Sequence, residues 1–207
     1  MKELIKNSRV IGYLEKIYRQ LNIDKFDGEL EEPIITVQSS TKAYGHVTCS
    51  KEWTVKDSQK YELNISAEYL KRPIENVVST MLHEMVHIYN LMHNIQDTSR
   101  GNIYHNKRFK EKAESVGLII EYNDRIGYSI ISPSEELLDY IIENGWTDIL
   151  INKGKYETDN GNQTMKPKEK KPSSTRKYIC PCCGNSVRAT KTINIICGDC
   201  NKTMQTA

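Results

Sequence analysis

The residues best suited to chemistry in this chain are two histidines and a glutamate in the run His83-Glu84-Met85-Val86-His87. Helical residues four apart lie one turn apart, so both imidazoles leave the same face and can bind one metal ion. Glu84 points about 100° further round the helix and can reach a metal-bound water without being a ligand. Zinc lowers the pKa of such a water, and the carboxylate can take its proton and later deliver it to a leaving amine. The pattern predicts a metal-dependent hydrolase with Glu84 as the general base.

The segment around this run has the pattern of a buried helix. Residues 73–92 begin with a proline, which is favoured in the first turn, and carry apolar side chains on almost every side. Burying three unpaired polar groups there would cost on the order of a few kcal/mol each. The alternative is an ordinary core helix with internally hydrogen-bonded histidines, and this cost favours the metal site over it.

A catalytic zinc site needs a third protein ligand and an open fourth position. We expect His105 to be that ligand, because it opens a predicted helix, residues 105–115, after a loop that can turn the chain back. Asp97 in that loop and Glu114 are acidic candidates for the same role, and Asp97 could instead orient a ligand imidazole through its second nitrogen. The two remaining histidines, which have less support, are His46 and His93.

Further helices and short strands are predicted around the helix of residues 73–92. Apolar spacing predicts a helix over residues 8–21, and alternation predicts strands over residues 34–38, 43–48 and 61–66. Another helix is predicted after Ser132, which can cap it, and ends at Gly145. At 207 residues the chain has room for one domain, which we place at residues 1–152, and a small appendage.

These residues resemble the SprT-like (Spartan-related) zinc metallopeptidase family. The motifs that carry the resemblance cover most of residues 8–130: His83-Glu84-x-x-His87, His105 followed by Phe109, the run Asn22-Ile23-Asp24-Lys25-Phe26-Asp27-Gly28-Glu29-Leu30 and the turn Ala43-Tyr44-Gly45. The chain departs from the family pattern at Asn106, because many members have glycine after the third histidine. This difference affects the tightness of the turn there and not the role of His105 as a ligand.

The resemblance implies that His83, His87 and His105 bind a catalytic zinc ion and that Glu84 is the general base. It also implies a zincin-like α+β domain with a small mixed or antiparallel sheet and an active-site helix. An extended peptide would add to the edge of that sheet as an extra strand.

No residue is assigned as the oxyanion stabiliser from the sequence. Tyr104, next to His105, and Tyr44 are candidates, although tyrosines in such places more often serve packing. Substitution of either by phenylalanine without loss of turnover would remove it as a candidate.

The cysteines near the end of the chain form a second metal-binding pattern. Two Cys-x-x-Cys pairs predict a closed structural zinc site in a zinc ribbon at residues 178–207, formed by Cys180, Cys183, Cys197 and Cys200. So short a stretch with few apolar residues could hardly fold without metal. We expect Cys182 to be a spectator thiol and Cys49 a small buried residue. The predicted cofactors are therefore two zinc ions, one catalytic and one structural.

The charge of the chain is distributed unevenly. Residues 1–152 hold 18 Lys or Arg against 23 Asp or Glu, whereas residues 153–207 hold 11 against 4. A basic linker, residues 153–177, followed by a ribbon favours nucleic acid as partner, although a solvated linker is the alternative. The candidate nucleic-acid-binding residues are Lys166, Lys168, Lys170, Lys171, Arg176, Lys177 and Arg188.

Composition indicates where such a protein would work. The chain is 38% hydrophobic, without the roughly 18 to 20 consecutive apolar residues that span a bilayer, and its N-terminus lacks the apolar core of a signal peptide. We expect a cytoplasmic protein, nucleoid-associated if it binds DNA, with no membrane partner.

Together these features predict a zinc endopeptidase that its basic tail brings to DNA, where it cleaves DNA-bound or DNA-crosslinked proteins. One alternative is a nucleic-acid-binding zinc protein whose helix site is structural and inactive. Another is a metal-dependent hydrolase of a different substrate, such as a nucleic acid.

Overall fold

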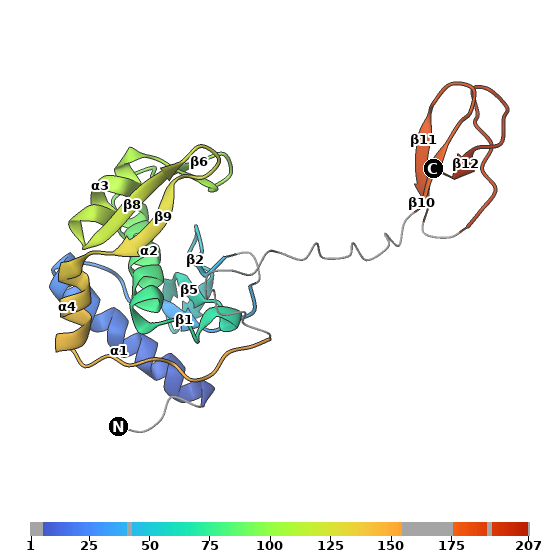
Figure 1. Cartoon of the computed structure of the whole chain (residues 1–207). Helices are drawn as coiled ribbons and strands as arrows, with labels where there is room; N and C mark the ends of the chain where they lie inside the picture. The colour runs from blue at the N-terminus through green and yellow to red at the C-terminus, as the bar shows by residue number, and fades with distance from the viewer. Residues whose placement is uncertain (1–5, 41–42, 155–175, 190–191, 207) are drawn as a thin grey trace. The chain divides into compact units, whose positions relative to one another are not determined.

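A computed structural model describes residues 6–40, 43–154, 176–189 and 192–206 of the chain. The chain divides into two compact units, Met1–Thr158 and Asp159–Ala207. The first combines helices with small sheets and the second is a small β unit, which confirms the predicted α+β class (Figure 1). No helix among the described residues is long and apolar enough to cross a membrane.

Two long helices form the centre of the first unit. Helix α2 (Ile74–Met92) agrees with its prediction to within one residue, and Pro73 lies at its N-cap. Helix α1 (Asn7–Phe26) runs five residues beyond the predicted end at residue 21 and stops where Asp27 adopts a left-handed conformation. The extension buries Phe26 completely, and the Asn22 side chain exchanges two hydrogen bonds with the backbone of Leu30. The end of α1 is thereby fixed to the chain that follows it.

A three-stranded mixed sheet lies on one side of α2. Its order is β1-β5-β2, with β1 (Ile34–Thr36) parallel and β2 (Gly45–Val47) antiparallel to β5 (Glu62–Ile65). The three strands occur where they were predicted but span only three or four residues each. A hairpin that was not predicted, β3 (Trp53–Val55) with β4 (Ser58–Lys60), connects β2 to β5, and a 3-10 helix, η1 (Ala67–Tyr69), follows β5. Strand β2 is left at an edge of the sheet.

A second sheet carries the region around His105. Its order is β6-β7-β9-β8, from β6 (Thr98–Ser99), β7 (Tyr104–His105), β8 (Leu118–Asn123) and β9 (Gly127–Pro133). The prediction that His105 opens a helix is wrong, because β7 pairs with β6 and β9 and helix α3 (Lys107–Ser115) starts two residues later. Asn106 caps α3, as its side chain accepts hydrogen bonds from the backbone of Arg108 and Phe109.

The start of the last helix also differs from the prediction. Ser134, not Ser132, caps α4 (Glu135–Glu143) by accepting a hydrogen bond from the backbone N–H of Leu137. Ser132 and Pro133 are held extended in β9, where they pair with Ile119 and Leu118 of β8. The β8–β9 hairpin therefore takes residues that the sequence pattern assigned to the helix.

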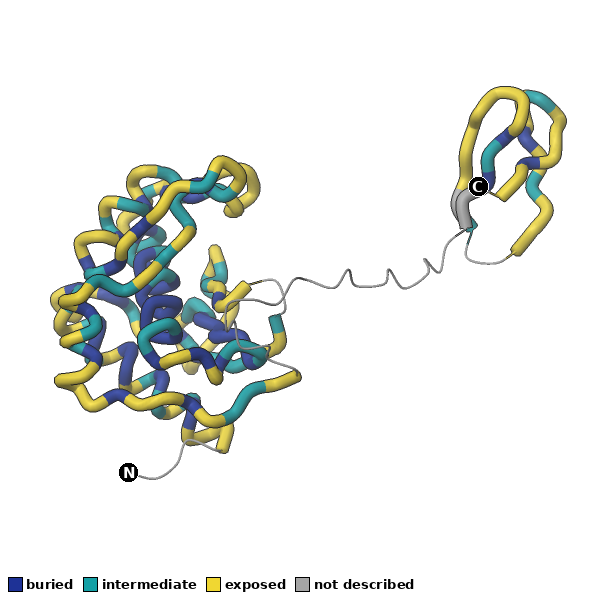
Figure 2. The backbone as a smooth tube through the Cα atoms, viewed as in Figure 1, coloured by how far each residue is buried: buried dark blue, intermediate teal, exposed yellow. Residues whose placement is uncertain are grey.

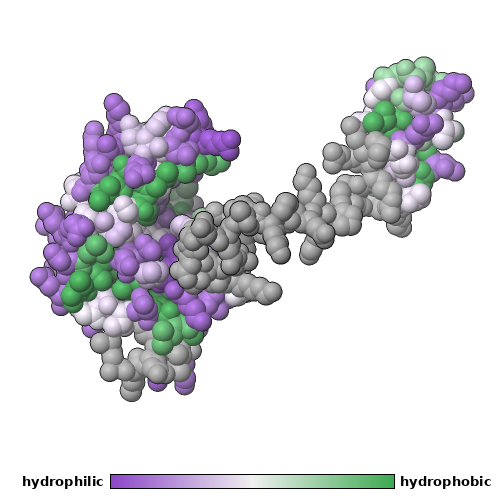
Figure 3. Space-filling model, viewed as in Figure 1, coloured by the Kyte–Doolittle hydropathy of each residue, from purple (hydrophilic) through white to green (hydrophobic). Residues whose placement is uncertain are grey.

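The core of the first unit surrounds α2. Twelve residues of this helix are buried, and Figure 2 shows α2 inside the domain as mainly buried with intermediate residues between. Hydrophobic side chains also remain on the surface, where Figure 3 shows them over the β8–β9 hairpin beside hydrophilic ones. Helix α2 is thus the centre of the core of this unit.

The second unit is a small antiparallel sheet. It has the order β11-β10-β12, from β10 (Arg176–Ile179), β11 (Ser186–Ala189) and β12 (Gln205–Thr206). Its buried residues are only Tyr178, Cys180, Cys197 and Met204 among those described. Residues 155–175, most of the predicted basic linker and including Lys166, Lys168, Lys170 and Lys171, lie outside the described residues. Arg176 and Lys177 lie in β10 and Arg188 in β11.

Candidate active site

Three histidines from two elements meet beside the centre of α2. His83 and His87 leave the same face of the helix, and β7 brings His105 to them. The Nε2 atom of His87 lies 3.2 Å from that of His83 and 3.1 Å from that of His105. Their ligand atoms form one of the two groups among the described residues that can hold a metal ion.

The spacing of these nitrogens fits zinc. With Zn–N bonds of about 2.0–2.1 Å, two ligands of a tetrahedral zinc ion lie roughly 3.3 Å apart. The distances between Nε2 atoms match this value. Burial lowers the pKa of His83 well below its usual range and that of His105 to about 4, so both rings are neutral near pH 7. Neutral imidazoles are the form that binds a metal.

Strand pairing fixes the position of His105. Its backbone N–H donates to Ile126 at 3.0 Å, and its backbone pairs with Gly127. Gly127 has a φ of +69°, and a Cβ there would stand 2.1 Å from the His105 carbonyl oxygen. Only glycine allows this approach. On the side-chain side, the Ser129 hydroxyl hydrogen bonds to Nδ1 of His105.

A second hydrogen-bond chain orients His87. Oδ2 of Asp97 lies 2.7 Å from Nδ1 of His87 and accepts a hydrogen bond from Asn90 at 2.9 Å. Burial acts to raise the pKa of the Asp97 carboxyl, but these bonds together hold it below its usual value. A carboxylate on Nδ1 directs the lone pair of Nε2 towards the metal position. Nδ1 of His83 is buried and has no hydrogen-bond partner in the described part of the chain.

Glu84 lies beside the three histidines and is almost fully buried, at 6% exposure. Burial raises the pKa of its carboxyl to about 7, although the backbone N–H of Val47 hydrogen bonds to it and acts in the opposite direction. Gly45 lets β2 approach so closely, since a Cβ there would lie 3.3 Å from Oε1 of Glu84 and 2.9 Å from Thr80. A carboxyl with a pKa near neutrality can both accept and return a proton.

A cavity of about 660 Å³ opens onto this group. His46 and Cys49 also line it, and Cys49 is exposed and accepts a hydrogen bond from Asn102. The expectation that Cys49 is buried is therefore wrong, because the chain after β2 turns along the cavity. The residues that line the cavity are Ala43, Gly45, His46, Val47, Cys49, His83, Glu84, His87, Leu91, Asn94, Ile95, Gln96, Asp97, Thr98, Asn102 and His105.

The two tyrosines proposed for the oxyanion do not line this cavity. The Tyr44 ring packs edge-on against Tyr69 and lies under the Arg72 guanidinium, 4.1 Å from its carbon. The Tyr104 hydroxyl lies 3.2 Å from that of Tyr122. Neither tyrosine is therefore placed to contact a substrate carbonyl at the histidines.

Glu114, the acidic candidate on α3, lies away from the metal position. Its carboxylate forms an ion pair with Lys110, at 3.5 Å, and not with the histidines. It is also outside the group of side chains that can hold a metal ion.

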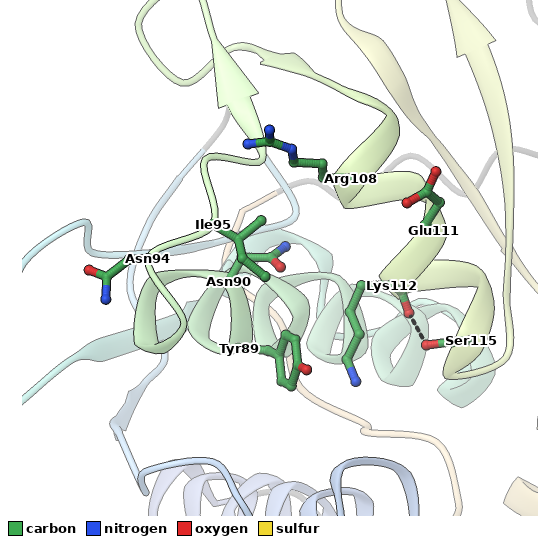
Figure 4. Close-up of a pocket in the computed structure, with 8 residues that line it drawn as sticks. All are labelled: Tyr89, Asn90, Asn94, Ile95, Arg108, Glu111, Lys112 and Ser115. Carbon is green, nitrogen blue, oxygen red and sulfur yellow. Dashed lines mark hydrogen bonds between the residues drawn. The ribbon is translucent and has the colours of Figure 1, made fainter.

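Another cavity, of about 430 Å³, lies between the end of α2 and α3 (Figure 4). Its charged side chains do not converge. Lys112 extends towards Tyr89, with Nζ 3.7 Å from the ring centroid, whereas Arg108 points away from Tyr89. This cavity lacks a converging set of reactive groups.

The second unit holds the other candidate metal group, Cys180, Cys183, Cys197 and Cys200. The sulfur atoms of Cys183 and Cys197 are 3.6 Å apart. Tetrahedral ligands with Zn–S bonds of about 2.3 Å lie roughly 3.8 Å apart, so the cluster is consistent with a zinc ribbon. Cys182 is exposed and outside the group.

The geometry of both candidate metal groups fits zinc, and the SprT-like family is a metallopeptidase-like family. A model of the SprT-like family matches residues 14–126, more than half of the chain, and the chain belongs to this family. The match includes His83, Glu84, His87 and His105. No curated protein and no solved structure matches the chain.

Three supporting residues of the site were not found from the sequence. Asn90 was detectable, because it lies one turn beyond His87 and is another polar residue on an apolar helix. Gly127 and Ser129 gave no such signal, because their roles depend on the pairing of β9 with β7.

Proposed function

We propose that this protein is a zinc-dependent endopeptidase. The observation that carries the proposal is the convergence of three Nε2 atoms beside a buried glutamate, at the wall of an open cavity. Three side-chain ligands leave a fourth position for water or substrate, which distinguishes a catalytic zinc site from a closed structural one.

The residues of the site divide the work of peptide hydrolysis. Zinc held by the histidines would lower the pKa of a water and polarise the scissile carbonyl. Glu84 takes the proton of the attacking water and passes it to the leaving amine. Asp97 and Ser129 keep the His87 and His105 rings in orientation through their Nδ1 atoms. Strand β2 lies against the Glu84 carboxyl through Gly45 and Val47 and contributes to its burial.

The edge strand β2 supports a peptide substrate. Gly45, His46 and Val47 line the cavity, and β2 pairs with a neighbour only on its β5 side among the described strands. An extended peptide can add to the open edge through main-chain hydrogen bonds, which requires little of its sequence. Because the Val47 N–H hydrogen bonds to Glu84, a peptide on β2 would lie beside the general base.

The proposal includes delivery to DNA through residues 153–207. Its support is the charge pattern, since this segment carries 11 Lys or Arg against 4 Asp or Glu and the rest of the chain is acidic. The substrates would then be proteins bound or crosslinked to DNA.

Two measurements on the full-length protein test the parts of this proposal separately. Zinc-loaded protein should cleave an unfolded protein such as casein, lose this activity with a chelator and regain it with zinc. Absence of cleavage under all conditions would refute the peptidase. Affinity for DNA should fall steeply with salt and drop when residues 153–207 are deleted. Unchanged affinity after the deletion would refute delivery by this segment.

A further inference from the structure

A cluster of tyrosines and cations lies on the second sheet, outside the cavity. Arg100 stacks over Tyr104, 4.6 Å from the ring centroid, and the Tyr104 and Tyr122 hydroxyls are 3.2 Å apart. The ring centroids of Tyr122 and Tyr128 are 5.1 Å apart, and Nζ of Lys110 lies 5.4 Å from the Tyr128 centroid. We call these five residues the tyrosine face.

The tyrosine face is accessible. Tyr122 is 52% exposed, and Tyr104 and Tyr128 are half-buried, so their rings are anchored while part of each remains open. The rings come from three strands, β7, β8 and β9, whose pairing holds them in place. Anchored aromatic rings bind a partner at low cost in conformational entropy.

The charge of this region differs from that of the remaining domain. Residues 98–133 contain six Lys or Arg and four Asp or Glu, a net charge of +2. The rest of residues 1–152 contains 12 against 19, a net charge of -7. Cations are in contact with the rings at both ends of the tyrosine face, although Lys110 also pairs with Glu114 at 3.5 Å. The partner that fits open aromatic rings beside cations is an anion with flat, stackable groups.

We propose that the tyrosine face binds single-stranded nucleic acid, with bases stacked on the tyrosines and phosphates beside Arg100 and Lys110. Stacking requires unpaired bases, because a duplex hides the faces of its bases. The proposal takes the class of partner from the proposed function but uses other residues, in the catalytic unit and not in the basic tail.

This position leaves the active site open. Tyr104 directly precedes His105 on β7, and successive side chains of a strand point to opposite faces. A strand of nucleic acid on the tyrosine face would therefore lie behind the third histidine and not in the cavity. Protein substrate and nucleic acid could then be held at the same time.

The test measures binding of a fluorescent oligothymidylate of about 12 nucleotides to the full-length, zinc-loaded protein by anisotropy at several salt concentrations. Tyr122→Ala should weaken binding at least about fivefold without changing its salt dependence, because a ring is lost and no charge. Tyr122→Phe should retain binding. Tyr44→Ala is the matched control, since Tyr44 is 53% exposed and also lies against an arginine.

Two outcomes would overturn the proposal. One is equal affinity of Tyr122→Ala, Tyr44→Ala and the unsubstituted protein. The other is the absence of any photocrosslink between a bromouracil-substituted strand and Tyr104, Tyr122 or Tyr128 of the unsubstituted protein, whether or not residues 153–207 are also crosslinked, and this result does not depend on how any variant folds. If Tyr122→Ala instead impairs cleavage of casein and leaves oligonucleotide binding intact, the face binds protein. If the unsubstituted protein does not cleave casein but its oligonucleotide binding still depends on Tyr122, the proposed peptidase activity is contradicted and the proposed nucleic-acid site is not.

Discussion

The carbonyl oxygen of His105 lies where Gly127 could not carry a side chain: a Cβ on Gly127 would be 2.1 Å away from it. Gly127 follows directly after the segment matched by the SprT-like family. The position of the third histidine therefore depends on a residue of β9 that contributes no ligand.

Gly127→Ala should lose zinc from the histidine site while keeping zinc at the cysteine cluster. The new methyl group must push β7 away from β9, and His105 moves with it. Gly145→Ala is the matched control, because Gly145 also has a positive φ but open space around its Cβ position. In both variants the new alanine must adopt a left-handed backbone conformation, which costs about 1–2 kcal/mol. Metal content by atomic absorption should fall by about one zinc per chain in Gly127→Ala only, and equal content in both would contradict this account.

Asp97→Ala should weaken zinc binding at the histidine site about 10- to 100-fold, because His87 loses the partner that orients its ring. Competition with a chromophoric chelator measures this affinity. Asn94→Ala is the control, since Asn94 lines the same cavity and has no contact with a histidine among the described hydrogen bonds. An Asp97→Ala affinity equal to that of the control would show that the Asp97 contact does not support the site.

The metal-free protein should be stabilised by Glu84→Gln at neutral and higher pH. The folded-state pKa of Glu84 is about 7 against an ordinary value of 4.5, so the folded state holds a proton that the unfolded state releases. The wild-type protein therefore loses stability relative to the variant as pH rises from about 4.5 to 7, by on the order of 3 kcal/mol. Thermal unfolding in chelator at pH 5 and pH 8 measures the difference, and a constant difference would contradict it.

Cys183→Ser and Cys182→Ser should behave differently although the residues are adjacent. Cys183 belongs to the group of four thiols, whereas the exposed Cys182 does not. Removal of one ligand should cost the second unit its zinc and, because its core is so small, its fold. Zinc content and limited proteolysis of residues 176–206 provide the measurement. Loss of zinc from Cys182→Ser would reverse the assignment.

The sequence predicted best those parts whose signals are local. The limits of α2 and the pairing of His83 with His87 follow from spacing and from apolar residues around a helix. His105 was predicted from its place after a loop and from the family resemblance. The two-residue strand that carries His105 could not be predicted, because it exists only through pairing with β6 and β9. The β8–β9 hairpin explains why Ser132 joins a strand, and the pairing of β9 with β7 explains why Ser129 meets His105. Cys49 was predicted to be buried from its residue type alone, and residue type says nothing about the path of the chain after β2.

The proposed mechanism places the proton transfers on Glu84. The most direct test is the rate of casein cleavage by zinc-loaded Glu84→Gln beside the wild-type protein, with zinc content measured in both samples. The account predicts equal zinc content and a rate lower by roughly 10²- to 10⁴-fold, because the amide cannot accept the proton. Cleavage at the wild-type rate with both sites loaded would contradict it.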